Sequence, residues 1–394
     1  MVVSLAASDD PTQPEPTLGE VALSVMERNW RAEGYTCPNR DRYPWQWLWD
    51  SCFHAIVWAE VGDDRAIEEL GTCFAGQLDG GFVPHMGYPG DPSCHESFWG
   101  RRGWSSITQP PMYGHAMAEL AARGMDLPSQ LVERAVSGLM FLVEHRRRSA
   151  AGLVELVHPW ESGADDSLRW DDLMGGPPAD IERRRARKGM LVAAVQRDAH
   201  GAAVANDEFP VGAVSFTALV AFNCAELGAL IGDALLLGAA AELSEAISAR
   251  WDEGIVTWVD DGPTAAGSGR ARSVEALLAA LVDPDPAHVR AALDSLVDHS
   301  AHGARFGPTG VHRAEAQYRP DTYWRGPAWP QLGYLLWIAA TRHGTTAVAA
   351  SIAESLIGGA GRSGFAEYWH PDTGAAGGAA PQSWTTLAWV VAQA

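Results

Sequence analysis

Residues 160–172, WESGADDSLRWDD, combine five carboxylates and one arginine with two tryptophans. Hydrolysis of a glycosidic bond needs two carboxyl groups: one protonated at the leaving oxygen, and one ionised to activate water or attack the anomeric carbon. An apolar neighbour and a like-charged neighbour each raise the pKa of a carboxyl group. Acids crowded beside tryptophans therefore suit a site that keeps one carboxyl group protonated near neutral pH.

Each acid in and around this segment also has a structural interpretation. Glu161 is as well suited to an ion pair that orders the loop as to a catalytic role, and Asp50 fits the N-cap of a helix equally well. Asp171 and Asp172 are expected to be solvated or to cap a helix. Glu367, from residue type alone, is expected to be a surface charge. Residue types by themselves therefore leave the choice of catalytic acids open.

Aromatic side chains gather in segments that have the character of loops. A sugar offers weakly apolar ring faces to Trp and Tyr, and a rim of hydroxyl groups to Asp, Gln and Arg. No glycine-rich phosphate loop follows a strand, so a carbohydrate fits this set of residues better than a nucleotide does. The loop residues that suggest such a site are Tyr43, Trp45, Trp47, Trp49, Asp50, Gln109, Trp160, Tyr323, Trp324, Arg325, Trp329, Glu367, Tyr368, Trp369, Gln382 and Trp384.

Helical periodicity dominates the chain, and runs typical of strands are sparse. The connections between the expected helices alternate between very short and long, which predicts antiparallel hairpins with all long loops at one end. The simplest closed arrangement is six helical hairpins around an axis, an all-α (α/α)6 barrel whose long-loop end forms a concave site. The expected helices are 18–32, 49–60, 63–77, 111–123, 128–147, 213–229, 233–250, 272–282, 286–296, 327–342, 345–358 and 383–393.

Length and composition limit the classes of protein. The 394 residues are divided into an expected disordered tail, 1–16, and a single domain, 17–394, with an irregular, lid-like insertion at about 173–210. The net charge of −20 argues against nucleic acid and membrane surfaces as partners. No apolar run is expected to reach the length of about eighteen residues that a membrane span needs, and a cytoplasmic location is expected because no signal peptide is evident.

Neither a metal site nor a cofactor is expected. The five cysteines show no CxxC spacing, and Cys94, His95 and Glu96 are too compact to form a ligand set. The basic run 183–188 is expected to be a solvated face. Three histidines are expected to be structural hydrogen-bonding groups: His85, His158 and His370.

Five ordered sequence blocks resemble glycoside hydrolase family 63 and its related barrels, which include trehalases. WESGADDSLRWD resembles the family signature WESGxDNSPRWD, and YPWQWLWD, SSITQPPM, YWRGPAWP and GFAEYWHPDTG…QSWT resemble further blocks in the same order. The blocks span about residues 35–393. The bacterial glucosylglycerate and mannosylglycerate hydrolases are members of this group that the sequence resembles.

The resemblance implies an (α/α)6 barrel and an inverting mechanism. It implies that Asp165 is the general acid and that Glu367 is the general base that activates water. An inverting pair is expected to be about 6.5–9.5 Å apart, which leaves space for the water. The resemblance also implies sugar-pocket or aglycone positions for Tyr43, Trp47, Trp49, Asp50, Gln109, Trp160, Gly163, Trp324, Arg325, Trp329 and Gln382.

The resemblance leaves the substrate open. Asp166 stands where the family has an amide, Pro381 replaces a Gln, and the 173–210 segment is shorter. A small soluble α-glucoside is expected as substrate, with glucosylglycerate as the best choice, and an Arg from 183–187 would suit a glycerate carboxylate. The alternatives are another α-glucoside such as trehalose or an oligosaccharide, a sugar epimerase or lyase, and an inactive carbohydrate-binding barrel. The sequence does not indicate the oligomeric state.

Overall fold

The computed structural model describes residues 16–177 and 181–394, and all twelve expected helices are present. Their bounds differ from the expected ones by a few residues, and one of them, η5, is a 3₁₀ helix. The predicted disordered tail, apart from Pro16, lies outside the described residues. The twelve helices are α1 Leu18–Asn29, α2 Leu48–Ala59, α3 Arg65–Cys73, α5 Tyr113–Ala122, α6 Ser129–Glu144, α9 Val214–Ile231, α10 Ala234–Ser248, η5 Val274–Leu281, α11 Pro286–Ser295, α12 Pro330–Arg342, α13 Thr346–Ser363 and α14 Leu387–Gln393.

Shorter elements lie between these helices. The short helices are η1 Phe74–Gly76, α4 Glu96–Trp99, η2 Pro159–Ser162, η3 Leu168–Trp170, α7 Asp171–Met174, η4 Ser268–Arg270 and η6 Ser383–Thr386, and one longer helix, α8 Ile181–Ala193, lies between α7 and α9. The strands form six antiparallel pairs: β1 Trp30–Arg31 with β2 Tyr35–Thr36, β3 Gln46–Trp47 with β4 Met86–Gly87, β5 Glu155–Leu156 with β8 Val211–Gly212, β6 Gln196–Arg197 with β7 Ala203–Ala205, β9 Trp251–Asp252 with β10 Thr257–Trp258, and β11 Tyr368–Trp369 with β12 Ala376–Gly377.

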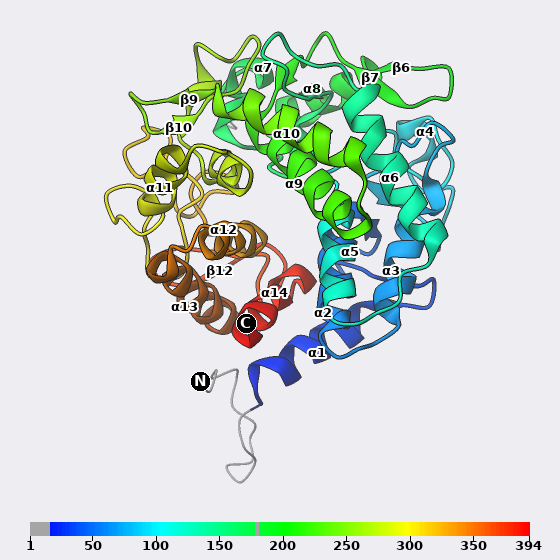
Figure 1. The fold of residues 1–394 in the computed structure, drawn as a ribbon, viewed down its shortest axis with the longest axis horizontal. Coiled ribbons are helices and arrows are strands. Elements are labelled where there is room, and N and C mark those ends of the chain that lie inside the picture. Colours follow the sequence, from blue (N-terminus) through cyan, green and yellow to red (C-terminus); the bar gives the residue numbers. More distant parts are fainter. Residues whose placement is uncertain (1–15, 178–180) are drawn as a thin grey trace.

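Six helices form an inner ring. α2 contacts α5, α5 contacts α9, and the series continues through η5, α12 and α14 back to α2. The other six lie outside, where α3 packs on α2, α10 on α9, α11 on η5 and α13 on α12. Figure 1 shows the inner helices around the middle of the molecule and their partners at its periphery. The helices are therefore arranged as an (α/α)6 barrel.

Burial follows this arrangement. Every residue of α2 is buried, as is every residue of α9 from Val214 to Cys224, because an inner helix packs on all sides. The outer helix α10 buries only one stripe, at the spacing of an amphipathic helix: Leu236, Ala239, Ala240, Leu243 and Ile247.

α9 corrects one expectation from the sequence. Its 18 residues have a mean hydropathy of 1.7, so by length and composition alone it is apolar enough to cross a membrane, although no such run was expected. In the fold, 72% of this segment is buried, and it packs against α5, α10 and η5. α9 is therefore a core helix of the barrel.

Hydrogen bonds link the six long connections into a continuous chain of contacts, here called the loop belt. The connections are 30–47, 74–112, 145–213, 249–273, 296–329 and 364–386. Because each is bonded to the next around the ring, they hold one another in place. The contacts, in order, are β3 with β4, Thr108 N–H to Glu161, the bridge Gly212–Asp261, the bridge Ser273–Val311, the bridge Ala328–Trp369, and Ser383 N–H to the Pro38 carbonyl.

The 173–210 insertion is more regular than expected. It contains the end of α7, the thirteen residues of α8 and the β6–β7 hairpin, while residues 178–180 lie outside the described residues. The prediction of an irregular segment was wrong because an arginine-rich stretch can be helical when its buried side chains pair with acids. That this insertion acts as a lid stays a prediction.

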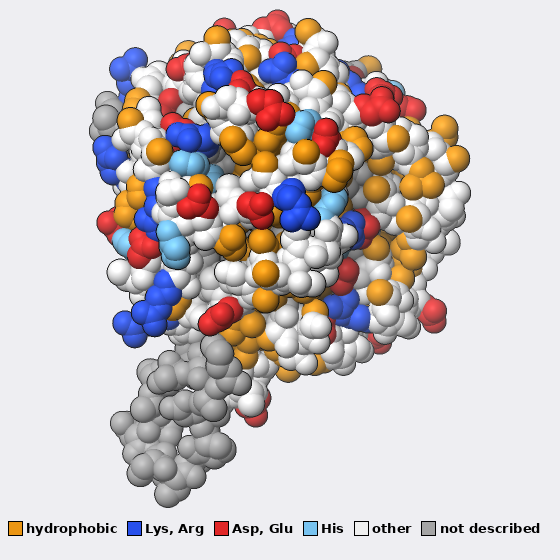
Figure 2. Space-filling view, turned by 60° about the vertical axis from the view of Figure 1, so that its left-hand side comes forward, with side chains coloured by type: hydrophobic (Ala, Val, Ile, Leu, Met, Phe, Trp, Pro, Cys, Tyr) orange, Lys and Arg blue, Asp and Glu red, His pale blue; other side chains and the backbone are white. Residues whose placement is uncertain are grey.

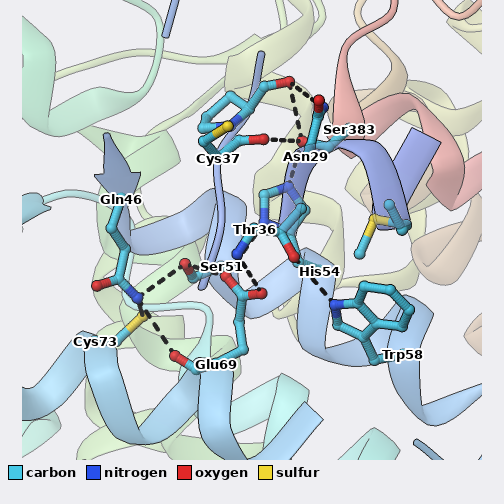
Figure 3. A network of polar contacts seen from close by, with 12 residues as sticks. Asn29, Thr36, Cys37, Gln46, Ser51, His54, Trp58, Glu69, Cys73 and Ser383 are labelled. Atoms are coloured by element: carbon cyan, nitrogen blue, oxygen red, sulfur yellow. Dashed lines mark hydrogen bonds and ion pairs between the residues drawn. The ribbon is translucent and has the colours of Figure 1, made fainter. Parts of the chain in front are cut away.

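Both ends of the barrel chain meet in a buried polar network (Figure 3). Ser383 of η6 is hydrogen-bonded to His54 of α2 at 2.6 Å, and His54 lies 3.4 Å from Glu69 of α3. Glu69 in turn accepts hydrogen bonds from Ser51 and from the Thr36 backbone.

On the face of the molecule drawn in Figure 2, acidic side chains are interspersed with basic and apolar ones.

Candidate active site

One cavity collects residues from five of the six long connections and is here called the main cavity. Asp165 and Glu367 both line it, although they belong to different connections. The cavity contains about 420 Å³ of empty space, counting its open mouth. Its lining residues are Pro38, Tyr43, Trp47, Trp49, Asp50, Gln109, Gly163, Asp165, Tyr323, Trp324, Glu367, Gln382 and Trp384.

A tight turn after η2 brings Asp165 to the cavity. Gly163, which follows η2, has a φ of 73°, in the left-handed region that favours glycine. A Cβ atom there would lie 2.5 Å from Cη2 of Trp49, so a larger residue would displace the indole. The glycine therefore lets the chain pass closely over Trp49 on its way to Asp165.

The surroundings of Asp165 favour its protonated form. Burial raises the pKa of Asp165 to about 7, Lys188 acts against this shift, and the negative charges of Asp166 and Glu367 add to it. At neutral pH this carboxyl group is therefore present in both protonation states, which suits a proton donor.

Asp166 differs from Asp165 because two cations bind it. The carboxylate lies 2.7 Å from Arg184 Nε and 3.0 Å from Lys188 Nζ. Burial raises the pKa of Asp166, but these two cations outweigh burial and hold the pKa below its ordinary value. Arg184 and Lys188 are buried, so the expectation that 183–188 is only a solvated face was wrong for these two residues. Their pairing with Asp166 depends on tertiary packing.

Glu367 is held by two donors beside the β11–β12 hairpin. The Tyr43 hydroxyl donates to its carboxylate oxygens at 3.2 and 3.3 Å, and the Ala379 N–H donates to Oε2 at 2.9 Å. Burial raises the pKa of Glu367, and these two hydrogen bonds oppose the shift. Gly378 has no room for a side chain, because a Cβ atom would lie 2.2 Å from Glu367 Oε2.

Several polar atoms of the lining residues are buried and lack a hydrogen-bond partner among the described residues. They include acceptors and donors, and each is a place where a hydroxyl group of a ligand would find a partner. These atoms are Asp50 Oδ1, Gln109 Oε1, Gln382 Oε1, Trp47 Nε1 and Trp324 Nε1.

Three expected pocket residues do not line the main cavity. Arg325 is buried and makes two 2.7 Å hydrogen bonds to Asp171, so its charge is already paired. Trp329 stacks on Trp324 at 3.7 Å between ring centroids and so lies behind a lining indole. Trp160 faces a second cavity beside Asp165. The family blocks place these residues near the site, but side-chain packing decides which of them reach the cavity.

The sequence left the roles of Glu161 and Asp50 open, and the structure gives these two acids different environments. Glu161 is fully buried and accepts two hydrogen bonds from the Arg146 guanidinium, at 2.5 and 3.0 Å, so it forms the ion pair that orders its loop. Asp50 is not an N-cap, because that position is Trp47, and it lies in the first turn of α2 facing the main cavity. Burial raises the pKa of Asp50 well above its ordinary value.

Three lining residues were not among the expected site residues. Tyr323 and Trp384 were recognised as aromatic loop residues, and their neighbours Trp324 and Gln382 were included. Pro38 carries no chemical signal in the sequence, since its position depends on the loop belt contact with Ser383. No group of three or more His, Cys, Asp or Glu residues arranged to bind a metal occurs within 16–177 and 181–394.

A comparison with protein families identifies the fold and its chemistry. Residues 43–385 match the model of the mannosylglycerate hydrolase MGH1-like glycoside hydrolase domain. The chain belongs to this family. It is therefore a glycoside hydrolase, and the resemblance to family 63 and the (α/α)6 fold class are both confirmed.

Individual relatives match over almost their whole length. The mannosylglycerate hydrolase of Rubrobacter radiotolerans is 27% identical, with 96% of this chain and 97% of that protein covered. The glucosylglycerate hydrolase of Mycolicibacterium hassiacum is also 27% identical, with 88% and 91% covered. A crystal structure of the family 63 mannosylglycerate hydrolase of Thermus thermophilus in complex with glucose matches with a TM-score of 0.81 at 25% identity, covering 96% of this chain and 100% of that one.

Proposed function

We propose that the protein hydrolyses a small α-glucoside with inversion at the anomeric carbon, and glucosylglycerate is the first candidate among the substrates that the names of its relatives give. The observation that carries this proposal is the presence of Asp165 and Glu367 in one cavity with different environments. The names of the relatives support a glycerate leaving group, and they favour mannosylglycerate as the second candidate substrate.

Asp165 acts as the general acid and Glu367 as the general base in this proposal. Asp165 donates its proton to the glycosidic oxygen as the bond from that oxygen to the anomeric carbon breaks. A water molecule attacks the anomeric carbon from the opposite face and gives a proton to Glu367. The hydrogen bonds from Tyr43 and the Ala379 N–H favour the ionised form of Glu367 against the effect of burial, and they fix the orientation of its carboxylate. The released sugar has the opposite anomeric configuration.

The lining of the main cavity suits a sugar ring. Trp47, Trp49 and Trp324 offer flat apolar surfaces to its faces. Hydroxyl groups would satisfy the unpartnered oxygens of Asp50 and Gln382, which otherwise stay buried without a hydrogen bond. A polyhydroxylated ligand therefore removes an energetic penalty that an apolar ligand would leave in place.

Two substitutions test the proposed roles. Asp165→Asn and Glu367→Gln keep the size of each side chain but remove its acid or base function. Each should lower kcat on glucosylglycerate by at least about 10²–10⁴-fold, while circular dichroism and the unfolding temperature stay close to those of the wild type. NMR of the fresh product should show the β-anomer of glucose.

The assay should include mannosylglycerate and trehalose. Near-normal turnover by either variant would contradict its assigned role, and initial release of the α-anomer from an α-glucoside would contradict inversion. A kcat/KM that is higher for mannosylglycerate than for glucosylglycerate would change the proposed sugar from glucose to mannose and leave the proposed mechanism unchanged.

A further inference from the structure

A second cavity, here called the outer cavity, adjoins the main cavity at Asp165. Trp47 and Asp165 line both, and the outer cavity contains about 820 Å³ of empty space, counting its open mouth as for the main cavity. Under the proposed function, on which this inference rests, Asp165 protonates the leaving oxygen. The sugar then occupies the main cavity, and the leaving group extends past Asp165 into the outer one.

Aromatic side chains form one wall of the outer cavity. The ring centroids of Trp99 and Trp160 are 6.0 Å apart, and that of Phe98 lies 4.7 Å from Trp99 and 6.4 Å from Trp160. Phe98 is 42% exposed, so part of its ring is open to a ligand in the cavity. Glycerate has no apolar face to cover these rings, whereas a planar apolar group would bury them.

The outer cavity also has one available cation. Arg185 of α8 lines it, and no carboxylate among the described residues pairs with Arg185. Its neighbours differ in this respect: Arg184 and Lys188 bind Asp166, and Arg187 lies 3.0 Å from Glu208. Arg185 is therefore free to bind an anionic group of a ligand.

Besides Asp165 and Arg185, three titratable side chains line the outer cavity, His85, Tyr88 and His95, and the Tyr88 hydroxyl accepts a hydrogen bond from Trp99 Nε1. Burial lowers the pKa of His85 to about 3, so this ring stays neutral at physiological pH. Lys188, whose Nζ lies 5.7 Å from the centroid of Trp160, is neutralised by Asp166. The lining thus combines a broad aromatic wall with the guanidinium group of Arg185, with which no carboxylate within 16–177 and 181–394 pairs.

We propose that the outer cavity selects a leaving group in which a carboxylate is joined to a planar apolar group, such as a 2-hydroxy acid with an aryl substituent on its third carbon. The carboxylate binds Arg185, and the aryl ring packs against Phe98 and Trp99. Glycerate fills only the polar part of this site.

A matched pair of substrates tests the inference. The 2-O-α-glucosides of D-glycerate and D-3-phenyllactate both release a 2-hydroxy acid, whose leaving oxygen is on the carbon next to the carboxylate. The third carbon carries a hydroxyl group in glycerate and a phenyl group in phenyllactate. We expect the KM of the phenyllactate glucoside to be lower by at least about tenfold. Phe98→Ala should reduce this tenfold difference between the two KM values. Arg185→Gln should raise the KM of the phenyllactate glucoside but not that of 2-phenylethyl α-glucoside, which is neutral.

A surface control and a binding measurement separate the outcomes. Arg290→Gln, an exposed residue of α11, should leave all KM values unchanged. Cleavage of the glycerate glucoside without preference for the phenyllactate one would overturn the inference and leave the proposed function intact. Calorimetry in the presence of glucose measures the affinity of the outer cavity for free phenyllactate and free glycerate independently of turnover. Tighter binding of phenyllactate without any glucoside hydrolysis would overturn the proposed function alone.

Discussion

The Asp165 carboxyl group lies among charges that act on it in opposite directions. Burial is the main cause of its raised pKa, the carboxylate of Asp166 adds to it, and the ammonium group of Lys188 opposes it. A general acid is active only while protonated, so activity should be lost as the pH rises through the pKa of Asp165, about 7. Burial therefore sets the alkaline limit of activity together with the two charged neighbours, which adjust it in opposite directions.

Removing either neighbour should move that limit in a predictable direction. Asp166→Asn removes a negative charge and leaves Lys188, so the pKa of Asp165 falls and the alkaline limb of kcat/KM moves to lower pH. Lys188→Met removes the positive charge, so the same limb moves to higher pH. The measurement is kcat/KM against pH for both variants and the wild type. Shifts of both variants in the same direction would show that Asp165 does not define this limb.

At the scale of elements, the segment that carries Asp165 depends on a buried ion pair. Arg146, just after α6, and Glu161 of η2 are both fully buried and are joined by two hydrogen bonds. Glu161 also accepts the N–H groups of Thr108 and Val157. One carboxylate therefore ties together α6, the 74–112 connection and the catalytic segment.

Removing one partner of this ion pair should lower the free energy of unfolding more than removing both partners. Arg146→Met leaves a buried, unpaired carboxylate and should lower the free energy of unfolding by about 3–5 kcal/mol. The double variant Arg146→Met/Glu161→Gln removes both charges, and the single Gln oxygen can still accept one of the two N–H groups, which bind different oxygens of Glu161, so part of the loss should be recovered. Urea denaturation measures both. A double variant less stable than the single one would contradict a penalty from unpaired charge.

Sequence patterns predict the elements better than the contacts between them. Apolar periodicity and loop lengths were sufficient for the helices and the barrel, because burial on one face or on all faces leaves a trace in the local sequence. The pairing of Arg325 with Asp171, and of Arg184 with Asp166, leaves no such trace. Each joins charges from separate elements, so the sequence could not separate arginines for the substrate from arginines with structural roles.

At the scale of the whole molecule, the barrel closes where its last inner helix meets its first. Ser383, His54 and Glu69 line up there in the order of a nucleophilic triad, but all three are fully buried. Substrate cannot reach the Ser383 hydroxyl, so the group is structural. Because Gln382 and Trp384 on either side of Ser383 line the main cavity, closure of the ring also positions the site.

Ser383→Ala tests this link between closure and function. The change removes the hydrogen bond to His54 and the one donated to the Pro38 carbonyl. The carbonyl keeps the Ser383 N–H and the Asn29 amide as donors, but the buried Nε2 of His54 loses its partner. The free energy of unfolding should fall by about 1–3 kcal/mol, and KM should rise because Gln382 and Trp384 lose their fixed position. Ser244→Ala is the control: its hydroxyl only bonds back to Ala240 within α10, so stability should change by less than about 0.5 kcal/mol. Equal effects of the two substitutions would mean that the buried network does not hold the ring closed.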